Sequence, residues 1–271
     1  MLRLPAVSGR FYPSQPAELT ELVRHYSAAE RASTSAPREK VRACLVPHAG
    51  YVYSGQVAGA VYSRIELPRQ FIILGVRHRF AGESAAILSS GAWRTPLGDA
   101  LVDSGLAAAL RAACPLLRED AVAHRSEHSL EVQLPFLQVL TPAFTFVPVA
   151  LGTIRFEELT QVGESLANVL AAHPDVLLLT TSDLNHYEDD ATTRSKDSKA
   201  IDRLLALDPK GLFHVCREEE ISMCGLGPAV AMLTALNTLG AKRAELVSYA
   251  TSADVSGDSD TVVGYAGMLF A

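Results

Sequence analysis

Short apolar runs alternate along the chain with longer segments in which apolar residues recur at helical spacing. The short runs are rich in Val, Ile, Leu and Phe, which is typical of β-strands, and they lie at residues 41–46, 71–76, 85–90, 144–151, 176–182, 244–250 and 261–270. The longer segments predict helices at residues 54–65, 104–113, 129–140, 156–171, 192–207 and 227–239.

Several predicted strands are apolar at successive positions, so both of their faces are expected to be buried. The sequence therefore predicts an α/β fold, a three-layer α/β/α sandwich around a mostly parallel sheet. The last two strands have no helix between them and should pair antiparallel, which makes the sheet mixed. We expect one domain over residues 1–271, with a linker-like stretch at residues 29–40 after a helix that Ser14 could cap and Pro16 could start.

The charge balance and the cysteines narrow the range of partners and compartments. The formal net charge is −6 and there is no basic run, which argues against a nucleic acid or an anionic membrane as partner. The four cysteines are scattered without a C-x-x-C pair, so no disulfide framework is expected, and Cys44 and Cys114 should be core residues. No apolar run approaches the roughly 20 residues that span a bilayer, and no signal peptide is recognisable, so a cytoplasmic protein is expected.

Polar side chains that could bind a metal or transfer protons follow three of the predicted strands. His48 comes just after the strand at 41–46, and His78 just after the strand at 71–76. Asp183 and His186 follow the strand at 176–182. Ligand sites in open α/β sheets gather beyond the carboxyl ends of strands, so we expect these side chains to converge.

The segment around His48 also predicts how that side chain is presented. Pro47 should end the strand, and Gly50 should let the backbone turn tightly, so that His48 points outward from a rigid edge. Tyr51 and Tyr53 follow, and either the pocket wall or packing under the next helix would suit them.

Cys224 differs from the other cysteines because "SMCGLGP" places it at the head of a predicted helix, where the helix N-terminus lowers the pKa of a thiol. His48, His78 and Cys224 together would form a mixed nitrogen and sulfur site suited to zinc, copper or iron, with positions open for water, substrate or dioxygen. Asp183 and His186 would then orient an imidazole or transfer protons.

Two other arrangements leave alternatives open. His128 and Glu131 are three residues apart on a predicted helix, and could share a metal or a proton or form a capping arrangement; we favour a structural or supporting role. "TSDLNH" could belong to a Ser–His–Asp hydrolase, but no G-x-S-x-G elbow is present. A P-loop and a G-x-G-x-x-G motif are also lacking.

A series of motifs resembles the Memo family, whose name abbreviates "mediator of cell motility". The motifs are "SGRFYP", "PHAGYVYSG", "ILGVRH", "EHSLEVQLPF", "TSDLNHY", "MCGLGP" and "SGDSDTVVGYAG". They occur in the family's order and run from about residue 6 to the C-terminus, so the resemblance covers essentially the whole chain.

The resemblance implies a fold like that of the class III extradiol (LigB-type) dioxygenases, which are non-haem iron enzymes. It also implies that His48, His78 and Cys224 line the metal pocket, and that Asp183 and His186 complete it. In the dioxygenase relatives, the histidine equivalent to His186 acts as the acid–base group for a catechol.

Two departures limit what the resemblance carries over. A thiolate replaces the carboxylate of the iron dioxygenases, so ring cleavage is not implied, and the softer ligand shifts metal preference toward copper. Val76 and Arg77 also stand where many Memo proteins have Pro-Ser. Arg77 could bind an anionic substrate or pair with a surface carboxylate, and we favour the pair.

The leading hypothesis is a metal-dependent oxidoreductase, with iron or copper (zinc is a further candidate), that acts on a small molecule or on dioxygen. Two alternatives follow from the resemblance. The first is a pocket without catalysis that binds a phosphorylated peptide, with Arg77 and the histidines contacting the phosphate. The second is a partner subunit of a radical SAM protein, with which prokaryotic Memo members often occur.

Overall fold

A computed structural model describes residues 1–33 and 37–271, so residues 34–36 of the linker-like stretch lie outside the described residues. The first part of that stretch is not a linker, because the helix α1 (Pro16–Ser33) continues through it. In the described ranges, no helix is both long and apolar enough to cross a bilayer.

The described strands build a mixed sheet with the order β1-β5-β6-β8-β3-β9-β2-β12-β10, while β11 pairs with β12, and β4 pairs with β7 and β8. The strands are β1 (Leu2–Arg3), β2 (Ala43–Val46), β3 (Gln70–Val76), β4 (Ala85–Ile87), β5 (Ala92–Thr95), β6 (Gly98–Val102), β7 (Arg118–Glu119), β8 (Thr145–Leu151), β9 (Val176–Thr181), β10 (His186–Glu188), β11 (Ala244–Thr251) and β12 (Val262–Phe270).

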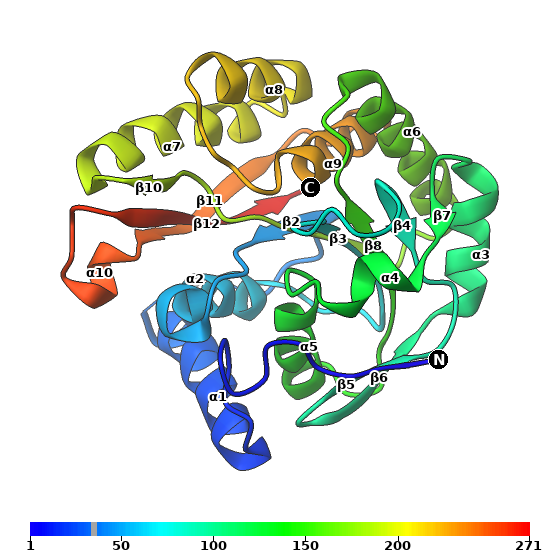
Figure 1. Cartoon of the computed structure of the whole chain (residues 1–271), viewed down its shortest axis with the longest axis horizontal. Coiled ribbons are helices and arrows are strands. Elements are labelled where there is room, and N and C mark those ends of the chain that lie inside the picture. The colour runs from blue at the N-terminus through cyan, green and yellow to red at the C-terminus, as the bar shows by residue number, and fades with distance from the viewer. Residues whose placement is uncertain (34–36) are drawn as a thin grey trace.

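Helices cover both faces of this sheet, which confirms the predicted three-layer sandwich (Figure 1). Besides α1, they are α2 (Tyr51–Arg64), α3 (Ser104–Ala113), α4 (Ala121–Arg125), α5 (Leu134–Leu140), α6 (Phe156–Ala172), α7 (Asp190–Leu205), α8 (Pro209–Glu218), α9 (Leu226–Thr238) and α10 (Ala253–Ser256), with a 3-10 turn at Glu131–Gln133. Helices α3, α6, α7, α8 and α9 bury their apolar residues on one face, and α1, α2 and α5 on the other.

The central strands are parallel and the C-terminal ones are antiparallel, as the pattern predicts. β2 pairs with β9, β9 with β3, and β3 with β8, all in parallel. β12 runs antiparallel to both β2 and β11, so the predicted pairing of the last two strands is confirmed. These central strands are buried along almost their whole length, which explains their continuous apolar runs.

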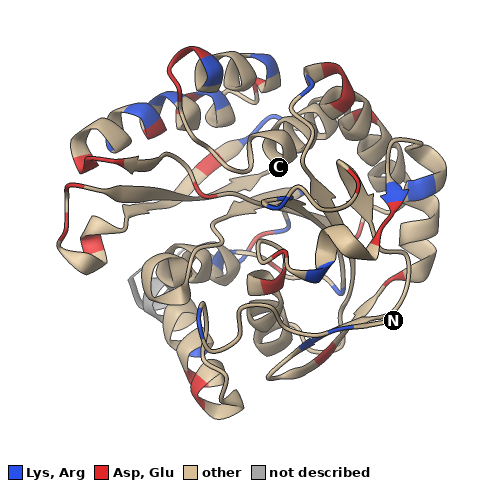
Figure 2. Ribbon diagram, viewed as in Figure 1, with Lys and Arg blue, Asp and Glu red and all other residues tan. Residues whose placement is uncertain are grey.

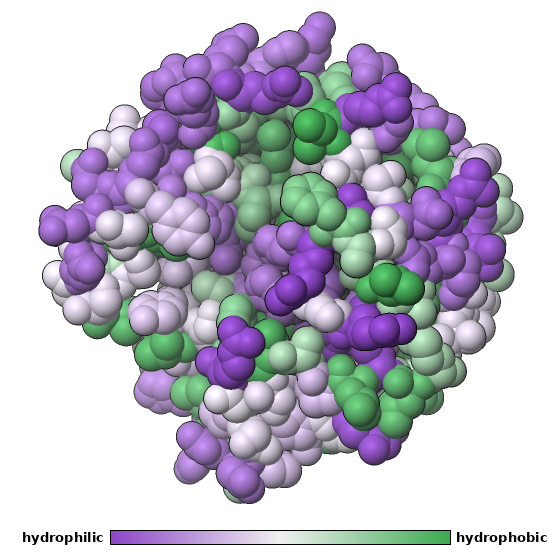
Figure 3. Space-filling model, viewed as in Figure 1, coloured by the Kyte–Doolittle hydropathy of each residue, from purple (hydrophilic) through white to green (hydrophobic). Residues whose placement is uncertain are grey.

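Charged positions are few on the central strands and concentrate on the outer helices and loops (Figure 2). Hydrophilic side chains accordingly cover much of the rim of the molecule (Figure 3). The internal strands therefore supply a rigid apolar frame, and the polar chemistry is left to the loops at its edges.

The strand order places three of the sequence-predicted loops together. β3, β9 and β2 are consecutive neighbours, and they end at Val76, Thr181 and Val46. Because they are parallel, the segments that follow them all emerge at the same edge of the sheet.

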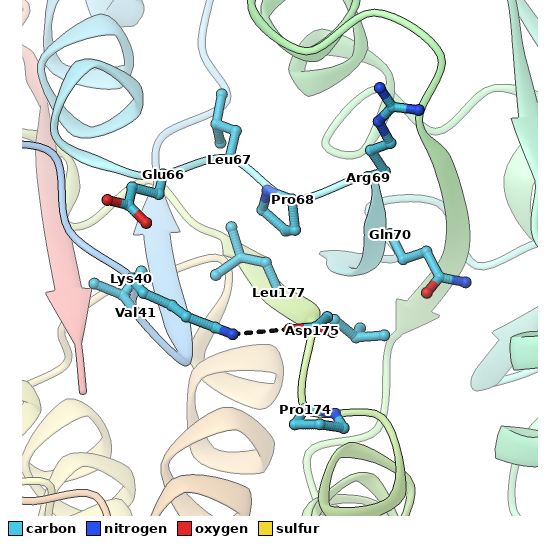
Figure 4. A pocket seen from close by; sticks show the side chains of 11 residues that line it. Lys40, Val41, Glu66, Leu67, Pro68, Arg69, Gln70, Pro174, Asp175 and Leu177 are labelled. Atoms are coloured by element: carbon cyan, nitrogen blue, oxygen red, sulfur yellow. Dashed lines mark hydrogen bonds and ion pairs between the residues drawn. The ribbon is translucent and has the colours of Figure 1, made fainter.

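The opposite, amino edge of the same strands also has a cavity, of about 390 Å³, but it offers no histidine or cysteine (Figure 4). Its ion pair joins Lys40 and Asp175 at 2.8 Å, and these side chains are 68% and 81% exposed. Exposed ion pairs contribute little to stability, and none of the lining residues of this cavity is among those that the sequence predicts for chemistry.

Candidate functional site

The carboxyl edge of the sheet opens into a cavity of about 580 Å³. The five residues predicted to form the metal pocket line it, and His128 joins them: His48, His78, Asp183, His186, Cys224 and His128. Side chains that are up to 176 residues apart in the sequence therefore share one space.

His48 is 1% exposed and lies at the centre of the group. Its backbone N–H donates to Asp183 Oδ1 at 2.7 Å, its Nδ1 lies 2.9 Å from Thr181 Oγ1, and its Nε2 lies 3.2 Å from Cys224 Sγ. Burial, reinforced by the nearby His78, lowers the pKa of His48 to about 3, so the imidazole is neutral near pH 7. When Nδ1 donates to Thr181, the lone pair on Nε2 is free to bind a cation.

The thiol of Cys224 does not have the lowered pKa that its place before a helix predicted. Its Sγ accepts a hydrogen bond from the Asp183 N–H at 3.2 Å. Burial, followed by the proximity of the Asp183 carboxylate, raises the pKa of Cys224, and burial also raises the pKa of Asp183. The cost of burying negative charge outweighs the helix N-terminus, and a nearby cation would offset that cost.

Gly225 fixes the position of Cys224. Its N–H donates to Ser182 Oγ at 2.8 Å, and a Cβ at Gly225 would lie only 2.7 Å from the Thr181 carbonyl oxygen. Only glycine lets the chain before α9 approach β9 this closely, so the "CG" dipeptide sets the distance between the thiol and His48.

Glu127 holds the two histidines on the other side of the cavity. Its carboxylate accepts from the backbone N–H of His78 at 2.8 Å, from His78 Nδ1 at 3.0 Å, and from the N–H groups of His128 and Ser129 at 2.8 Å each. Burial would raise the pKa of Glu127, but the hydrogen bond from His78 and the surrounding histidines hold it well below its usual range. A carboxylate on Nδ1 leaves the His78 Nε2 atom for the cavity.

His128 also lines this site; the sequence left a metal role open for it but favoured a structural or supporting one. Its ring stacks on that of His78 with 4.6 Å between centroids, and the ring of His48 is 5.6 Å away. Burial, together with the nearby His48, lowers the pKa of His128 to about 4. The sequence feature that could have indicated His128 is the neighbouring Glu127 in "SEHSLE". The Glu127 carboxylate accepts hydrogen bonds from the backbone of this loop and from His78 Nδ1.

Two donor groups are close enough to hold a metal ion, and they share His48. The first joins His48 to His78 and His128, and the second joins it to Asp183 and Cys224; within each group the ligand atoms lie within 4.8 Å of one another. The predicted set of His48, His78 and Cys224 is thus distributed over both groups.

His186 lies at the rim of the cavity, at the start of β10. Its N–H donates to Ser222 Oγ at 2.8 Å, and its Nδ1 lies 3.0 Å from the Ser222 carbonyl oxygen, which accepts the Nδ1 proton. In the neutral ring, Nε2 is then left as an acceptor. Ser222 in turn donates to Asn185 Oδ1 through its N–H and its hydroxyl, so a series of hydrogen-bonded polar groups orients the imidazole.

That series ends at Asp197, a fully buried residue of α7 that accepts from the Asn185 N–H at 2.8 Å and from the Tyr249 hydroxyl at 2.7 Å. Burial raises the pKa of Asp197 from 3.8 to about 6. A carboxyl group with a raised native pKa binds protons more tightly in the folded state, so its contribution to stability is complete below pH 3.8 and is lost as the pH rises through 6.

We therefore expect Asp197→Asn to gain about 2 kcal/mol in free energy of unfolding relative to wild type when the pH is raised from about 4 to about 7.5. Denaturant unfolding of both proteins at each pH measures this double difference. An equal change in the two proteins would show that Asp197 titrates as in the unfolded chain.

Glu131 has a structural role, as favoured for the pair with His128. It is fully buried, and its carboxylate binds Arg3 Nη1 at 2.5 Å, the N–H groups of Ala6 and Val7 at 2.7 and 3.1 Å, and the Tyr12 hydroxyl at 2.6 Å. These bonds attach the N-terminal segment to the sheet. The two residues are not on one regular helix face, because Glu131 begins a 3-10 turn and His128 precedes it.

In the part of the chain that the structure describes, Arg77 does not form the carboxylate pair that was favoured for it. Its Nη1 donates to the carbonyl oxygens of Phe80 and Gly82, at 3.1 and 2.8 Å, and it does not line the histidine cavity. It closes the loop after β3 instead of pairing with a carboxylate.

The turn around His48 also differs in part from its prediction. β2 ends at Val46 before Pro47, as expected, but Gly50 has a φ of −58°, which any residue can adopt. Tyr51 is buried and donates to the Val132 carbonyl oxygen at 2.6 Å, and Tyr53 is 41% exposed. Neither tyrosine lines the cavity.

The fold and the site together define an α/β protein with histidine, cysteine and carboxylate donors at the carboxyl edge of a mostly parallel sheet. The family model described as Memo-like protein matches residues 3–269. The chain therefore belongs to the Memo family.

Relatives in the same family are similar over their full lengths. MEMO1 family protein MK0963 of Methanopyrus kandleri is 39% identical over 280 residues, which cover 100% of this chain and 99% of that protein. MEMO1 family proteins of Methanosarcina barkeri and Aquifex aeolicus are 39% and 38% identical, each with 99% of both chains covered.

A solved structure with a similar fold is that of the uncharacterized protein JW3007 from Escherichia coli K12, with a TM-score of 0.50. It covers 83% of this chain and 99% of its own, at 13% identity. At this identity the similarity concerns the fold alone.

Proposed function

We propose that this Memo family protein is a metal-dependent oxidoreductase that uses iron or copper, with zinc as a further candidate, and acts on a small-molecule substrate in the cytoplasm. The observation that carries the proposal is the pair of donor groups that share the buried, neutral imidazole of His48. Imidazole and thiolate are ligands that iron, copper and zinc accept.

The donor set fits a cation for two reasons. The Nδ1 atoms of His48 and His78 have partners in Thr181 and Glu127, so each ring can offer Nε2 as the ligand atom. Burial makes the anions of Cys224 and Asp183 costly, and a bound cation would offset that cost.

His48, His78 and Cys224 would hold the ion, with His128 or Asp183 available as a further ligand. The ion would supply Lewis acidity and, if it is iron or copper, electron transfer. The chain's own groups would orient the substrate and move protons: His186 presents Nε2 at the rim, and its Nδ1–H bond to Ser222 fixes the ring.

A relation to the class III extradiol dioxygenases is part of this proposal. Histidines after neighbouring parallel strands and His186 at the rim support it. The thiolate of Cys224 departs from the carboxylate of those enzymes, so the proposal is limited to redox chemistry and does not specify ring cleavage.

The alternative of a pocket that binds a phosphorylated peptide loses its expected contact, because Arg77 is turned away from the cavity. A role beside a radical SAM protein is compatible with the proposed chemistry, since a redox-active metal site can act jointly with another redox protein.

Metal analysis of the protein purified without added metal tests the proposed function. We expect about one iron or copper ion per chain, retained through gel filtration and removed by a chelator. Negligible metal in the purified protein, combined with no uptake of Fe(II), Cu or Zn on titration, would contradict the proposal.

A further inference from the structure

A second cavity, of about 620 Å³, adjoins the histidine cavity. The two share Phe11, His78 and His128 as lining residues. They therefore meet at the stacked imidazoles, and a molecule seated in the second cavity would reach the candidate metal ligands directly.

Three arginines line this second cavity: Arg10, Arg79 and Arg125. They come from different parts of the fold, namely the N-terminal segment, the loop after β3 and the end of α4. The Arg10 guanidinium lies 5.9 Å from the centre of the Phe11 ring, on the wall that both cavities share.

These arginines are exposed, and in the part of the chain that the structure describes none of them forms an ion pair with a carboxylate. Other arginines of the protein do pair, among them Arg64, Arg94 and Arg194. No lining residue of the second cavity is acidic. A concentration of positive charge in a chain of net charge −6 is a local exception that needs an anion to balance it.

The carboxylate that binds the shared histidines does not supply that anion. Glu127 lies between His78 and His128, but its side chain is only 2% exposed and its oxygens already accept bonds from both residues and from Ser129. The guanidinium groups therefore face solvent in the cavity, where they can bind a ligand.

We propose that the arginine cavity binds the anionic group, a phosphate or a carboxylate, of a small substrate whose other end lies against His78 and His128. This proposal rests on the proposed function, because it supplies the substrate class for the same site. Guanidinium groups bind both anions through paired, charge-assisted hydrogen bonds. A small molecule fits better than a chain, because it can occupy both adjoining cavities at once.

The test measures binding of phenyl phosphate, benzoate and phenol by calorimetry at about pH 8, where imidazoles are ordinarily neutral. The variant is Arg79→Gln with Arg125→Gln. Its matched control is Arg24→Gln with Arg118→Gln, which removes two exposed arginines outside both cavities and gives the same net charge, −6 − 2 = −8. Coincident unfolding curves of the two double variants verify that the fold is retained.

We expect saturable binding of at least one anion and not of phenol, with affinity lowered roughly 10-fold per arginine in the cavity variant and unchanged in the control. The tighter of the two anions distinguishes a phosphate substrate from a carboxylate one. The proposal is wrong if wild type binds neither anion, or if the two double variants bind the anion with equal affinity. It is also wrong if a phosphotyrosine peptide binds at least ~10-fold tighter than phenyl phosphate, because that result would assign the cavity to a peptide.

Failure of this proposal is distinguishable from failure of the proposed function, because the titrations are run on both chelator-treated and untreated protein. Arginine-dependent anion binding by a protein that holds no metal as purified and takes up none on titration would leave the anion site standing and overturn the metal site. Bound metal with no arginine-dependent anion binding would give the reverse result.

Discussion

Alanine at position 48 is expected to lower metal affinity by more than about 100-fold, because loss of a ligand should exceed the 10–100-fold cost of losing a supporting residue. His48 is the one residue common to both donor groups, so its removal disables both. The measurement is the metal content of the purified variant, followed by titration with the metal found in wild type. Metal binding by His48→Ala as tight as that of wild type would contradict the assignment.

Two further variants identify the ligands. Cys224→Ala removes a member of the donor group formed with Asp183, and His128→Ala a member of the donor group formed with His78. The variant with the larger loss of affinity shows which group holds the ion. His25→Ala, which changes an exposed histidine of α1 outside the cavity, is the matched control and should bind metal normally.

Alanine in place of Glu131 is expected to lower the free energy of unfolding by about 4 kcal/mol, the typical cost of breaking a buried ion pair. The change would leave Arg3 as a buried charge without its partner, and the N–H groups of Ala6 and Val7 without their acceptor. Denaturant unfolding at neutral pH measures the change.

Two control variants separate the loss of the Glu131 contacts from the general effect of changing a glutamate. Glu131→Gln keeps the shape and part of the hydrogen bonding, so its loss should be smaller than that of alanine. Glu164→Ala, at an exposed position of α6, should change stability by less than about 0.5 kcal/mol. A loss below about 1 kcal/mol for Glu131→Ala would show that the N-terminal segment contributes little to stability.

The sequence predicted the central sheet well because its strands are buried on both faces. The strands β2, β3, β8 and β9 have nearly continuous apolar runs. The hairpin of β5 and β6 was missed because only some of its residues are buried, and the two-residue strands β1 and β7 exist through their pairing partners. Such strands have little local signal.

The candidate site was predictable as far as topology determines it. The segments with His48, His78 and Asp183 follow neighbouring parallel strands, so their convergence follows from the fold. The position of His128 depends instead on Glu127, whose contacts are made only in the folded chain. The thiol pKa of Cys224 was mispredicted for a related reason, since burial is a tertiary property.

The arginine cavity left no pattern in the sequence. Arg10, Arg79 and Arg125 are far apart along the chain, and although Arg10 lies within "SGRFYP", no shared motif connects the three. A net charge of −6 also directs attention away from anionic partners. Local charge concentration arises from folding and is invisible in a sum over residues.

The attachment of the N-terminal segment through Glu131 bears on the order in which the protein folds. The contacts of Glu131 join residues 119 to 128 positions apart, and they place Phe11 on the wall of both cavities. Closing so long a loop costs entropy that only the assembled sheet can offset. The N-terminal segment that carries Phe11 should thus form late in folding. Its backbone amides should exchange their hydrogens sooner than those of the parallel strands beneath it.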